Sequence, residues 1–228
     1  MSRLQPGSAR DLAELIFGYG LILVALWTPR FPQLILTSLT LAVTVLIVLA
    51  RRNKFKAQDS FRGCNAFDGQ EDDSLGLGLR GLIPSLWILP AALAFAALSV
   101  FVAKRVGTLH SLYQGDALHI SGYVLWTLYQ QFLLQDYFMP RLTRLLTNEA
   151  VAIGLSAVLF AAAHLPNLPL TAATLIWGAV SCSLFRRYRN LYALGFAQGL
   201  LGLCFAICLP DAWHHHLRVG LGYLHYPH

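Results

Sequence analysis

The sequence predicts an all-α protein, a polytopic transmembrane bundle of about seven helices, from its composition and its apolar stretches. Hydrophobic residues form 56% of the 228-residue chain and charged residues 12%, and the mean hydropathy is +0.55. Soluble domains carry about twice that share of charged residues, so the balance is typical of proteins embedded in a bilayer. A helix needs about 20 mainly apolar residues to cross a bilayer, and seven stretches approach this length. They are 12–29, 32–50, 83–103, 119–139, 149–165, 169–185 and 191–209.

The first half of the chain contains three of these stretches and one long polar segment. Arg3 and Arg10 precede the first stretch, which lacks a small-residue cleavage site, so a retained helix is favoured over a removable signal peptide. Segment 51–82 opens with basic residues, turns acidic at Glu71, Asp72 and Asp73, and ends rich in glycine. This composition is typical of a solvated loop. We expect a cytoplasmic connection between the second and third helices, with partner binding as the alternative.

Prolines and capping residues mark the ends of the fourth and fifth helices. Pro140 and the stretch 166–169, which holds two prolines, predict helix stops, because proline lacks the amide proton and disfavours helix in the residue before it. Thr147 or Asn148 can cap the fifth helix, and Glu149 suits its positive end. The core is therefore expected to be a helix bundle.

The net charge of +6 is unevenly placed, and its placement indicates a membrane topology rather than nucleic-acid binding. Lysine and arginine are enriched in the cytoplasmic segments of membrane proteins. We therefore expect the N-terminus inside and the C-terminus outside. On that topology the outer segments carry Arg30, Lys104, Arg105 and Arg218. The inner segments carry Arg3, Arg10, Arg51, Arg52, Lys54, Lys56, Arg62, Arg80, Arg141, Arg144, Arg186, Arg187 and Arg189.

The four cysteines are Cys64, Cys182, Cys204 and Cys208. They lack the paired spacing of a zinc site or a disulfide framework. Cys204 and Cys208 are one helical turn apart, which leaves metal or redox chemistry as the alternative to packing. We expect small apolar packing residues.

Five polar side chains lie inside otherwise apolar stretches: Gln130, Gln131, Gln135, His164 and Gln198. A polar group at bilayer depth is costly unless it finds a partner or a cavity, so it tends to mark a functional site. Gln131 and Gln135 share a helix face, whereas Gln130 lies about 100° behind Gln131. Interhelical hydrogen bonding explains each residue taken singly. Their joint occurrence favours one shared site.

The order and spacing of three motifs resemble the CPBP family, which comprises CAAX prenyl proteases of type 2, bacteriocin-processing and immunity proteins, and lysostaphin-resistance-like membrane proteins. The family's motifs are Glu-Glu-x-x-x-Arg, Phe-x-x-x-His and His-x-x-x-Asn, on neighbouring membrane helices. The corresponding segments here are Gln130-Gln131-Phe-Leu-Leu-Gln135, Phe160-Ala-Ala-Ala-His164 and Gln198-Gly-Leu-Leu-Gly202.

The resemblance covers residues 118–209 and divides the chain into three parts. Residues 1–117 are expected to form N-terminal transmembrane helices and a cytoplasmic loop, 118–209 an intramembrane peptidase core, and 210–228 an interfacial tail. The segment from His215 to Tyr223 is similar to the tail of some bacterial members. The resemblance therefore implies a multi-pass protein of a bacterial inner membrane.

The family resemblance implies a glutamate that deprotonates a water, histidines that orient it, and an asparagine that stabilises the oxyanion of a cleaved peptide bond. Only Phe160 and His164 match the motifs by identity. A glutamine amide cannot take up a proton near neutral pH, so the usual base is missing. By position, the resemblance implies catalytic roles for His164, Gln131, Gln198 and Gln135, and substrate binding for Gln130, Phe160 and Gly202.

Two residues could replace the missing base. His164 has an intrinsic pKa near 6.5, which suits a general base. Asp136 is the carboxylate within the motif helix, but five residues beyond Gln131 it points about 140° away, and we expect it to be solvated beside Arg141. A lone histidine does not provide the three ligands that catalytic zinc usually takes. We therefore favour His164 as the base and expect no metal and no cofactor.

The C-terminal tail combines histidines with Asp211 and aromatic residues, which leaves two interpretations open. A metal site is one, and an interfacial belt at the outer leaflet is the favoured one. The histidines are His214, His215, His216, His225 and His228, and the aromatic residues are Trp213, Tyr223 and Tyr226.

Three functions fit the sequence. The favoured one is a divergent intramembrane endopeptidase whose partners are a peptide or membrane-protein substrate and the lipid bilayer, with no nucleic acid. The second is a pseudoprotease that binds peptides or lipidated termini without cutting them, as an immunity, chaperone or regulatory protein. The third is a transporter or structural membrane protein, although neither repeated halves nor paired broken helices are visible.

Overall fold

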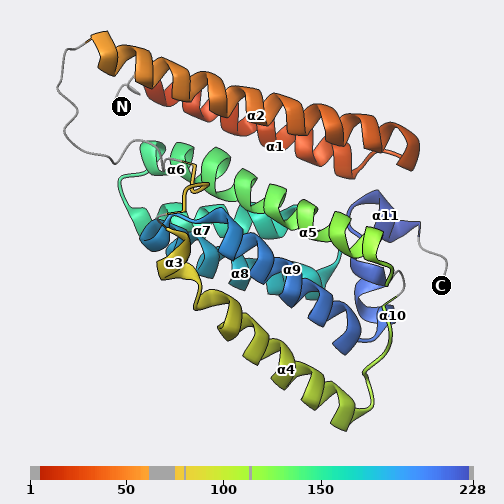
Figure 1. Cartoon of the computed structure of the whole chain (residues 1–228). Helices are drawn as coiled ribbons and strands as arrows, with labels where there is room; N and C mark the ends of the chain where they lie inside the picture. Colours follow the sequence, from red (N-terminus) through yellow and green to blue (C-terminus); the bar gives the residue numbers. More distant parts are fainter. Residues whose placement is uncertain (1–5, 62–74, 80, 113–114, 226–228) are drawn as a thin grey trace.

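The computed structural model describes residues 6–61, 75–79, 81–112 and 115–225, and these residues form a helical bundle without strands (Figure 1). Each of the seven predicted stretches coincides largely with a helix, which confirms the predicted fold class. In chain order the elements are α1 (Pro6–Leu26), α2 (Arg30–Phe61), α3 (Leu82–Ser85), α4 (Ile88–Val106), α5 (Ala117–Phe132), the π-helix η1 (Leu133–Phe138), α6 (Met139–Leu145), α7 (Glu149–Ala162), α8 (Leu168–Tyr188), α9 (Leu191–Cys208), α10 (Asp211–His214), the 3-10 helix η2 (His215–Leu217) and α11 (Leu221–Leu224).

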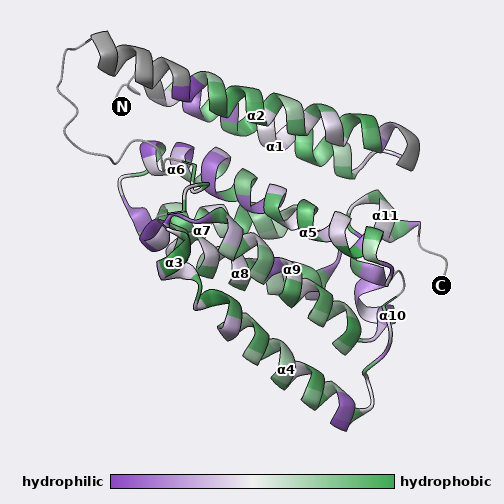
Figure 2. Cartoon of the chain, viewed as in Figure 1, coloured by the Kyte–Doolittle hydropathy of each residue, from purple (hydrophilic) through white to green (hydrophobic). Residues whose placement is uncertain are grey.

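Four helical segments within the described residues are long and apolar enough to cross a membrane. They are Pro32–Arg52, Leu82–Val106, Leu168–Tyr188 and Leu191–Cys208, and α7 is a shorter apolar helix. Large apolar side chains such as Leu34 and Phe95 are 72% and 63% exposed, which a lipid environment explains and water does not. Hydrophobic residues run along α4 and α5, and hydrophilic ones gather near α6 and α10 (Figure 2). The protein is an integral membrane protein.

Helix α9 lies at the centre of the bundle, where it packs against α4 and α5. Gly195 and Gly199 let its backbone approach α5 closely, because a Cβ at Gly195 would lie 2.4 Å from Leu128. Thr127 Oγ1 donates to the Gly195 carbonyl at 2.9 Å across this contact. Small residues and a buried hydroxyl are the usual means of bringing membrane helices together. The close contact brings the predicted site residues of α5 and α9 together.

A network of ion pairs joins α1 to α2 and α6 at one end of the bundle. Arg51 Nη1 lies 2.6 Å from Asp11 Oδ1, and Arg51 Nη2 lies 3.0 Å from Glu14 Oε1. Arg144 Nε lies 2.9 Å from Asp11 Oδ2, and Arg141 Nη2 lies 2.7 Å from Glu14 Oε2. The Arg141 side chain is 2% exposed. These pairs neutralise charges that the bundle buries, so α1 is held by electrostatic contacts as well as by apolar packing.

Two predicted helix ends differ from the structure. The polar segment is expected to begin at residue 51, but α2 continues to Phe61, because this stretch contains no glycine or proline and is rich in helix-favouring side chains. Pro140 is expected to stop the fourth helix, but it lies in the first turn of α6. Proline is tolerated there because the preceding π turn already interrupts the regular hydrogen-bond pattern, with Met139 N bonded to Leu134 O five residues back.

Side-chain caps begin α5 and α7. Asp116 Oδ1 accepts from the backbone N–H groups of Leu118 and His119 at 3.1 Å, and the His119 N–H holds the pKa of this carboxyl below its usual value. Asn148 Oδ1 accepts from Ala150 N at 2.9 Å, so Asn148 is the cap of α7 among the two predicted candidates. The turn between α7 and α8 contains Pro166, as predicted.

The described cysteines are packing residues, as predicted. Cys182 and Cys204 are buried, Cys208 is partly buried, and all three are free thiols. The Sγ atoms of Cys204 and Cys208 are 3.7 Å apart on one face of α9. Several residues named in the sequence predictions lie outside the described part of the chain: Arg3, Arg62, Cys64, Glu71, Asp72, Asp73, Arg80, Tyr226 and His228.

Candidate active site

The motif helix changes geometry where it carries the predicted site residues. Helix α5 runs directly into the π-helix η1, and all six residues of η1 are buried. Gln131 near the end of α5 is 0% exposed and Gln135 in η1 is 1% exposed. Single π turns inside α-helices occur often at functional sites because they change which side chains point inward. Here the π turn brings consecutive polar residues, Gln135 and Asp136, into the protein interior.

Four glutamines form one hydrogen-bonded chain that joins α5, η1 and α9. Gln131 Nε2 donates to Gln198 Oε1 at 2.6 Å, and Gln135 Nε2 donates to Gln131 Oε1 at 3.1 Å. Gln198 Nε2 donates to Gln130 Oε1. Trp177 Nε1 of α8 also donates to Gln198 Oε1, at 3.0 Å. These hydrogen bonds satisfy most of the side-chain N–H and C=O groups of the four glutamines without any charged partner.

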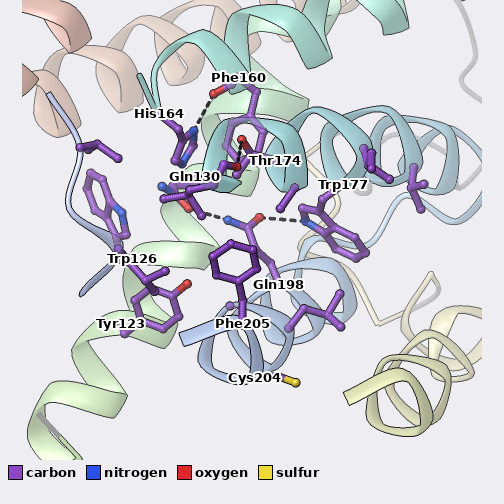
Figure 3. Close-up of a pocket in the computed structure, with 18 of the residues that line it drawn as sticks. Tyr123, Trp126, Gln130, Phe160, His164, Thr174, Trp177, Gln198, Cys204 and Phe205 are labelled. Atoms are coloured by element: carbon purple, nitrogen blue, oxygen red, sulfur yellow. Dashed lines mark hydrogen bonds between the residues drawn. The ribbon is translucent and has the colours of Figure 1, made fainter. Parts of the chain in front are cut away.

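A cavity of about 1130 Å³ lies beside these hydrogen-bonded glutamines. Gln130, Gln198 and His164 line it together with aromatic residues that include Trp126 and Phe205. Figure 3 shows Gln130 and Gln198 between His164 and Trp177. No charged side chain of the described residues lines the cavity. The walls are therefore apolar except for a small group of amide, imidazole and hydroxyl groups.

His164 enters the cavity from the turn that follows α7. Its backbone N–H donates to the Ala161 carbonyl at 2.8 Å, and its ring Nδ1 lies 2.8 Å from the Phe160 carbonyl oxygen. Because a carbonyl oxygen only accepts, Nδ1 carries the proton and Nε2 carries the lone pair in the neutral ring. The Phe160 ring packs edge-on against the imidazole, with centroids 4.9 Å apart. The Phe-x-x-x-His spacing thus fixes both the tautomer and the orientation of His164.

The C-terminal tail holds this turn in place. Asn167 Nδ2 donates to the His214 carbonyl at 2.7 Å and to the Arg218 carbonyl at 3.0 Å. Gly220 N donates to the Leu165 carbonyl at 2.9 Å. The tail therefore supports the turn that contains His164 through three hydrogen bonds.

The structure separates the predicted site residues into two groups. Gln130, Phe160, His164, Gln198 and Gly202 line the cavity. Gln131 and Gln135 do not line it and instead hydrogen-bond behind Gln198. These two glutamines are placed to orient Gln198 rather than to touch a ligand.

Asp136 differs from its predicted environment. It is 7% exposed rather than solvated, and its Oδ2 has no hydrogen-bond partner among the described residues. Arg141, its expected neighbour, pairs with Glu14 of α1 instead. The π turn explains the difference, because it rotates Asp136 inward relative to a regular α-helix. Asp136 does not line the cavity.

Gly202 leaves room for a tyrosine hydroxyl of α5. A Cβ added at Gly202 would lie 1.9 Å from the Tyr123 hydroxyl oxygen. Tyr123 lines the cavity beside Trp126 (Figure 3). The space beside Gln198 is therefore filled by the Tyr123 hydroxyl.

The variant Gly202→Ala is expected to lose about 1–3 kcal/mol of stability, because the new methyl group must displace the Tyr123 ring. Thermal unfolding in detergent measures the loss, and Tyr123→Phe in the same chain should recover part of it. Gly122→Ala is the matched control, since nothing lies within 4 Å of a Cβ at Gly122. Equal stability of the Gly202→Ala and Gly122→Ala proteins would contradict the contact.

Sequence patterns do not reveal two of the residues that shape the site. Trp177 donates to Gln198 from the middle of α8, and Tyr123 fills the space at Gly202. Both are aromatic residues in long apolar helices, where lipid exposure and core packing are the ordinary explanations. Only the spatial neighbourhood of α5, α8 and α9 identifies them.

The arrangement can bind an apolar segment and present it to one imidazole and two amides. Neutral His164 offers a lone pair on Nε2, and an amide Nε2 of Gln130 or Gln198 can donate to a carbonyl or oxyanion. The amides cannot act as bases near neutral pH. Among the described residues that line the cavity, His164 therefore has the side chain suited to accept a proton near neutral pH.

Comparison with known proteins gives one match. A family model described as type II CAAX prenyl endopeptidase Rce1-like matches residues 75–204, which is more than half of the chain. The matched residues include every predicted site residue. No curated protein and no solved structure matches the chain.

Proposed function

Because the chain belongs to the Rce1-like family of type II CAAX prenyl endopeptidases, we propose that it is an intramembrane peptidase that cleaves a peptide or membrane protein beside His164. The observation that carries the proposal is the contact of His164 Nδ1 with the Phe160 carbonyl oxygen, which assigns the ring proton to Nδ1. This contact is 2.8 Å long and leaves Nε2 as a base at an apolar cavity. The family resemblance found in the sequence and the matched family model agree on this part of the chain.

In the proposed reaction, a water attacks the carbonyl carbon of the scissile peptide bond. His164 Nε2 takes the water proton as the new C–O bond forms. The negative charge on the former carbonyl oxygen is stabilised by amide N–H groups of Gln130 and Gln198. The C–N bond then breaks, and the imidazolium returns its proton to the leaving amine. Gln131 and Gln135 act through Gln198, whose side chain they hold.

The substrate is proposed to enter as an apolar segment. The cavity of about 1130 Å³ is lined mainly by apolar side chains, which suits a hydrophobic peptide or a terminus that carries a lipid. Acidic or strongly basic segments find no opposite charge in the described lining.

The proposed location is a bacterial inner membrane with the N-terminus in the cytoplasm. Arg10, Arg51, Arg141 and Arg144 lie at one end of the bundle, where they pair with Asp11 and Glu14. Basic residues favour the cytoplasmic side, so this end is proposed to face the cytoplasm. Reporter fusions at each terminus test this orientation.

A cleavage assay tests the function. Purified protein in liposomes is incubated with single-span membrane peptides, with and without a lipid-modified terminus, and the products are identified by mass spectrometry. We expect His164→Ala to slow cleavage about 100-fold, because a general base contributes at least that factor. His225→Ala is the matched control, since His225 is an exposed tail residue that bonds the Leu221 carbonyl. Cleavage that is equally fast in His164→Ala would overturn the mechanism.

A second candidate function is peptide binding without cleavage. The observation in its favour is the uncharged glutamine chain at the positions where the family has glutamates and a histidine. This alternative predicts that labelled peptides bind the wild-type protein and are recovered intact. If the wild-type protein binds the peptides but cleaves none of them, the binding function is favoured over the peptidase function.

A further inference from the structure

A cluster of histidine and aspartate side chains lies away from the peptidase site, where the α4–α5 loop meets the end of α9. Thr108 Oγ1 donates to the Cys208 carbonyl at 2.8 Å, and His110 N donates to the Ile207 carbonyl at 3.0 Å. The chain continues from α9 into α10, which contributes Asp211 and His214. Two segments about 100 residues apart in sequence are thus held together at this point.

The imidazoles of this cluster converge on one carbonyl oxygen. His110 Nε2 lies 2.8 Å from Leu209 O, and His214 Nε2 lies 2.9 Å from the same oxygen. Asp211 Oδ1 is 3.6 Å from His214 Nε2. Ligand atoms of His110, Asp211 and His214 all lie within 4.8 Å of one another. Small movements of the His110, Asp211 and His214 side chains would bring their ligand atoms around one ion.

The surroundings of His110 favour an ion at Nε2. Its Nδ1 lies 3.0 Å from the Ser111 carbonyl and its Nε2 lies 2.8 Å from the Leu209 carbonyl. A neutral imidazole has one N–H group, so it can donate to only one of two carbonyl oxygens. A second proton or a metal ion at Nε2 allows the ring to face both carbonyl oxygens at once. A ligating histidine normally donates its other N–H to a carbonyl oxygen, as His110 does to Ser111.

We propose that His110, Asp211 and His214 bind a divalent transition-metal ion, with zinc as the best match and the Leu209 carbonyl oxygen as a further ligand. Imidazole nitrogen and carboxylate oxygen are ordinary zinc ligands at about 2.0–2.2 Å. At bonds of that length, the tetrahedral angle of zinc separates two ligands by about 3.3 Å, so the Nε2–O distances of 2.8 and 2.9 Å must widen slightly when the ion binds. His216 Nδ1 lies 2.8 Å from Asp211 Oδ1 and helps to position the carboxylate.

Metal binding changes one existing contact. Leu217 N donates to His214 Nδ1 at 3.3 Å, and a neutral histidine that ligates through Nε2 carries its proton on Nδ1. This long hydrogen bond therefore opens when the ion binds. The hydrogen bond that is lost belongs to η2. Residues His215 and His216 of this short helix have positive φ angles of 46° and 53°.

The proposed ion has a structural role in the tail. Leu209, Pro210 and Trp213 of this region line the large cavity, so the ion would join the α4–α5 loop, the end of α9 and α10 beside one wall of it. The site is independent of the proposed peptidase chemistry, which uses none of these side chains. The proposal departs from the sequence-based expectation of no metal because it adds His110, which lies outside the C-terminal tail, to Asp211 and His214.

Direct zinc binding tests the proposal. Full-length protein is purified in detergent with a tag free of histidine, stripped with a chelator, and titrated with zinc against a coloured competitor. We expect one zinc ion per chain, a higher melting temperature with zinc, and binding at least about tenfold weaker in His110→Ala and Asp211→Asn. Both altered residues are partly exposed, so the variants should fold.

His119→Ala is the matched control. His119 Nδ1 lies 2.5 Å from Asp116 Oδ2 in an exposed pair at the start of α5, so the variant removes a histidine beside an aspartate but not one of the proposed ligands. It should bind zinc as the wild type does. The proposal is overturned by a wild type that binds no stoichiometric zinc, by unchanged affinity in both ligand variants, or by an equal loss in the control.

Discussion

The double variant Gln131→Glu/Gln198→His is expected to cleave membrane peptides about 100-fold faster than the wild type, because a histidine at cavity-lining position 198, held from behind by a carboxylate at 131, adds a second base beside His164. Gln131 Nε2 now donates to Gln198 Oε1 at 2.6 Å. A glutamate at 131 would lie within reach of a ring N–H of a histidine at 198. The carboxylate would keep the Gln135 Nε2 donor that Gln131 Oε1 now uses at 3.1 Å. Initial rates in the liposome cleavage assay measure the gain.

The two single variants should not share this gain. In Gln131→Glu alone, the new carboxylate faces Gln198 Oε1, so two acceptors meet at a buried position and the pair is destabilised. Adding His164→Ala to the double variant should lower its rate again, which ties the activity to the same cavity. A folded double variant that cleaves no faster than the wild type would show that the scaffold needs more than these two side chains.

The variant Glu14→Gln is expected to destabilise the protein by about 3–5 kcal/mol, because it leaves a buried charge without its partner. Arg141 is 2% exposed and lies 2.7 Å from Glu14 Oε2. Glu14 also faces Arg51 at 3.0 Å, so its loss weakens the contacts of α1 with α2 and with α6. Unfolding by heat or by a denaturing detergent measures the change.

An exposed ion pair provides the control for this prediction. Glu149 pairs with Arg186, and their side chains are 53% and 42% exposed. Glu149→Gln should cost less than about 1 kcal/mol, as exposed ion pairs usually do. Replacing Arg141 by methionine in the Glu14→Gln protein should restore part of the stability, since it removes the unpaired charge. A similar loss in Glu14→Gln and Glu149→Gln would contradict a buried role for Glu14.

Much of the fold could be predicted because hydropathy and capping act locally. The apolar stretches locate the helices, and Asn148 caps α7 through neighbouring N–H groups. The predictions for Pro140 and Asp136 are wrong for a shared reason. A regular helix is the natural extrapolation from sequence, whereas the chain turns into the π-helix η1 just before Pro140. That change of geometry depends on packing among several helices.

By itself, the sequence determined a membrane-embedded helical bundle and the set of polar side chains that had to find partners inside it. Apolar length and motif spacing are properties of consecutive residues, so no knowledge of neighbours is needed. Only the tertiary structure decided that Gln130, His164 and Gln198 line one cavity while Gln131 and Gln135 lie behind it. The reason is geometric: a helix period tells which residues share a face, but not which helix or cavity that face meets.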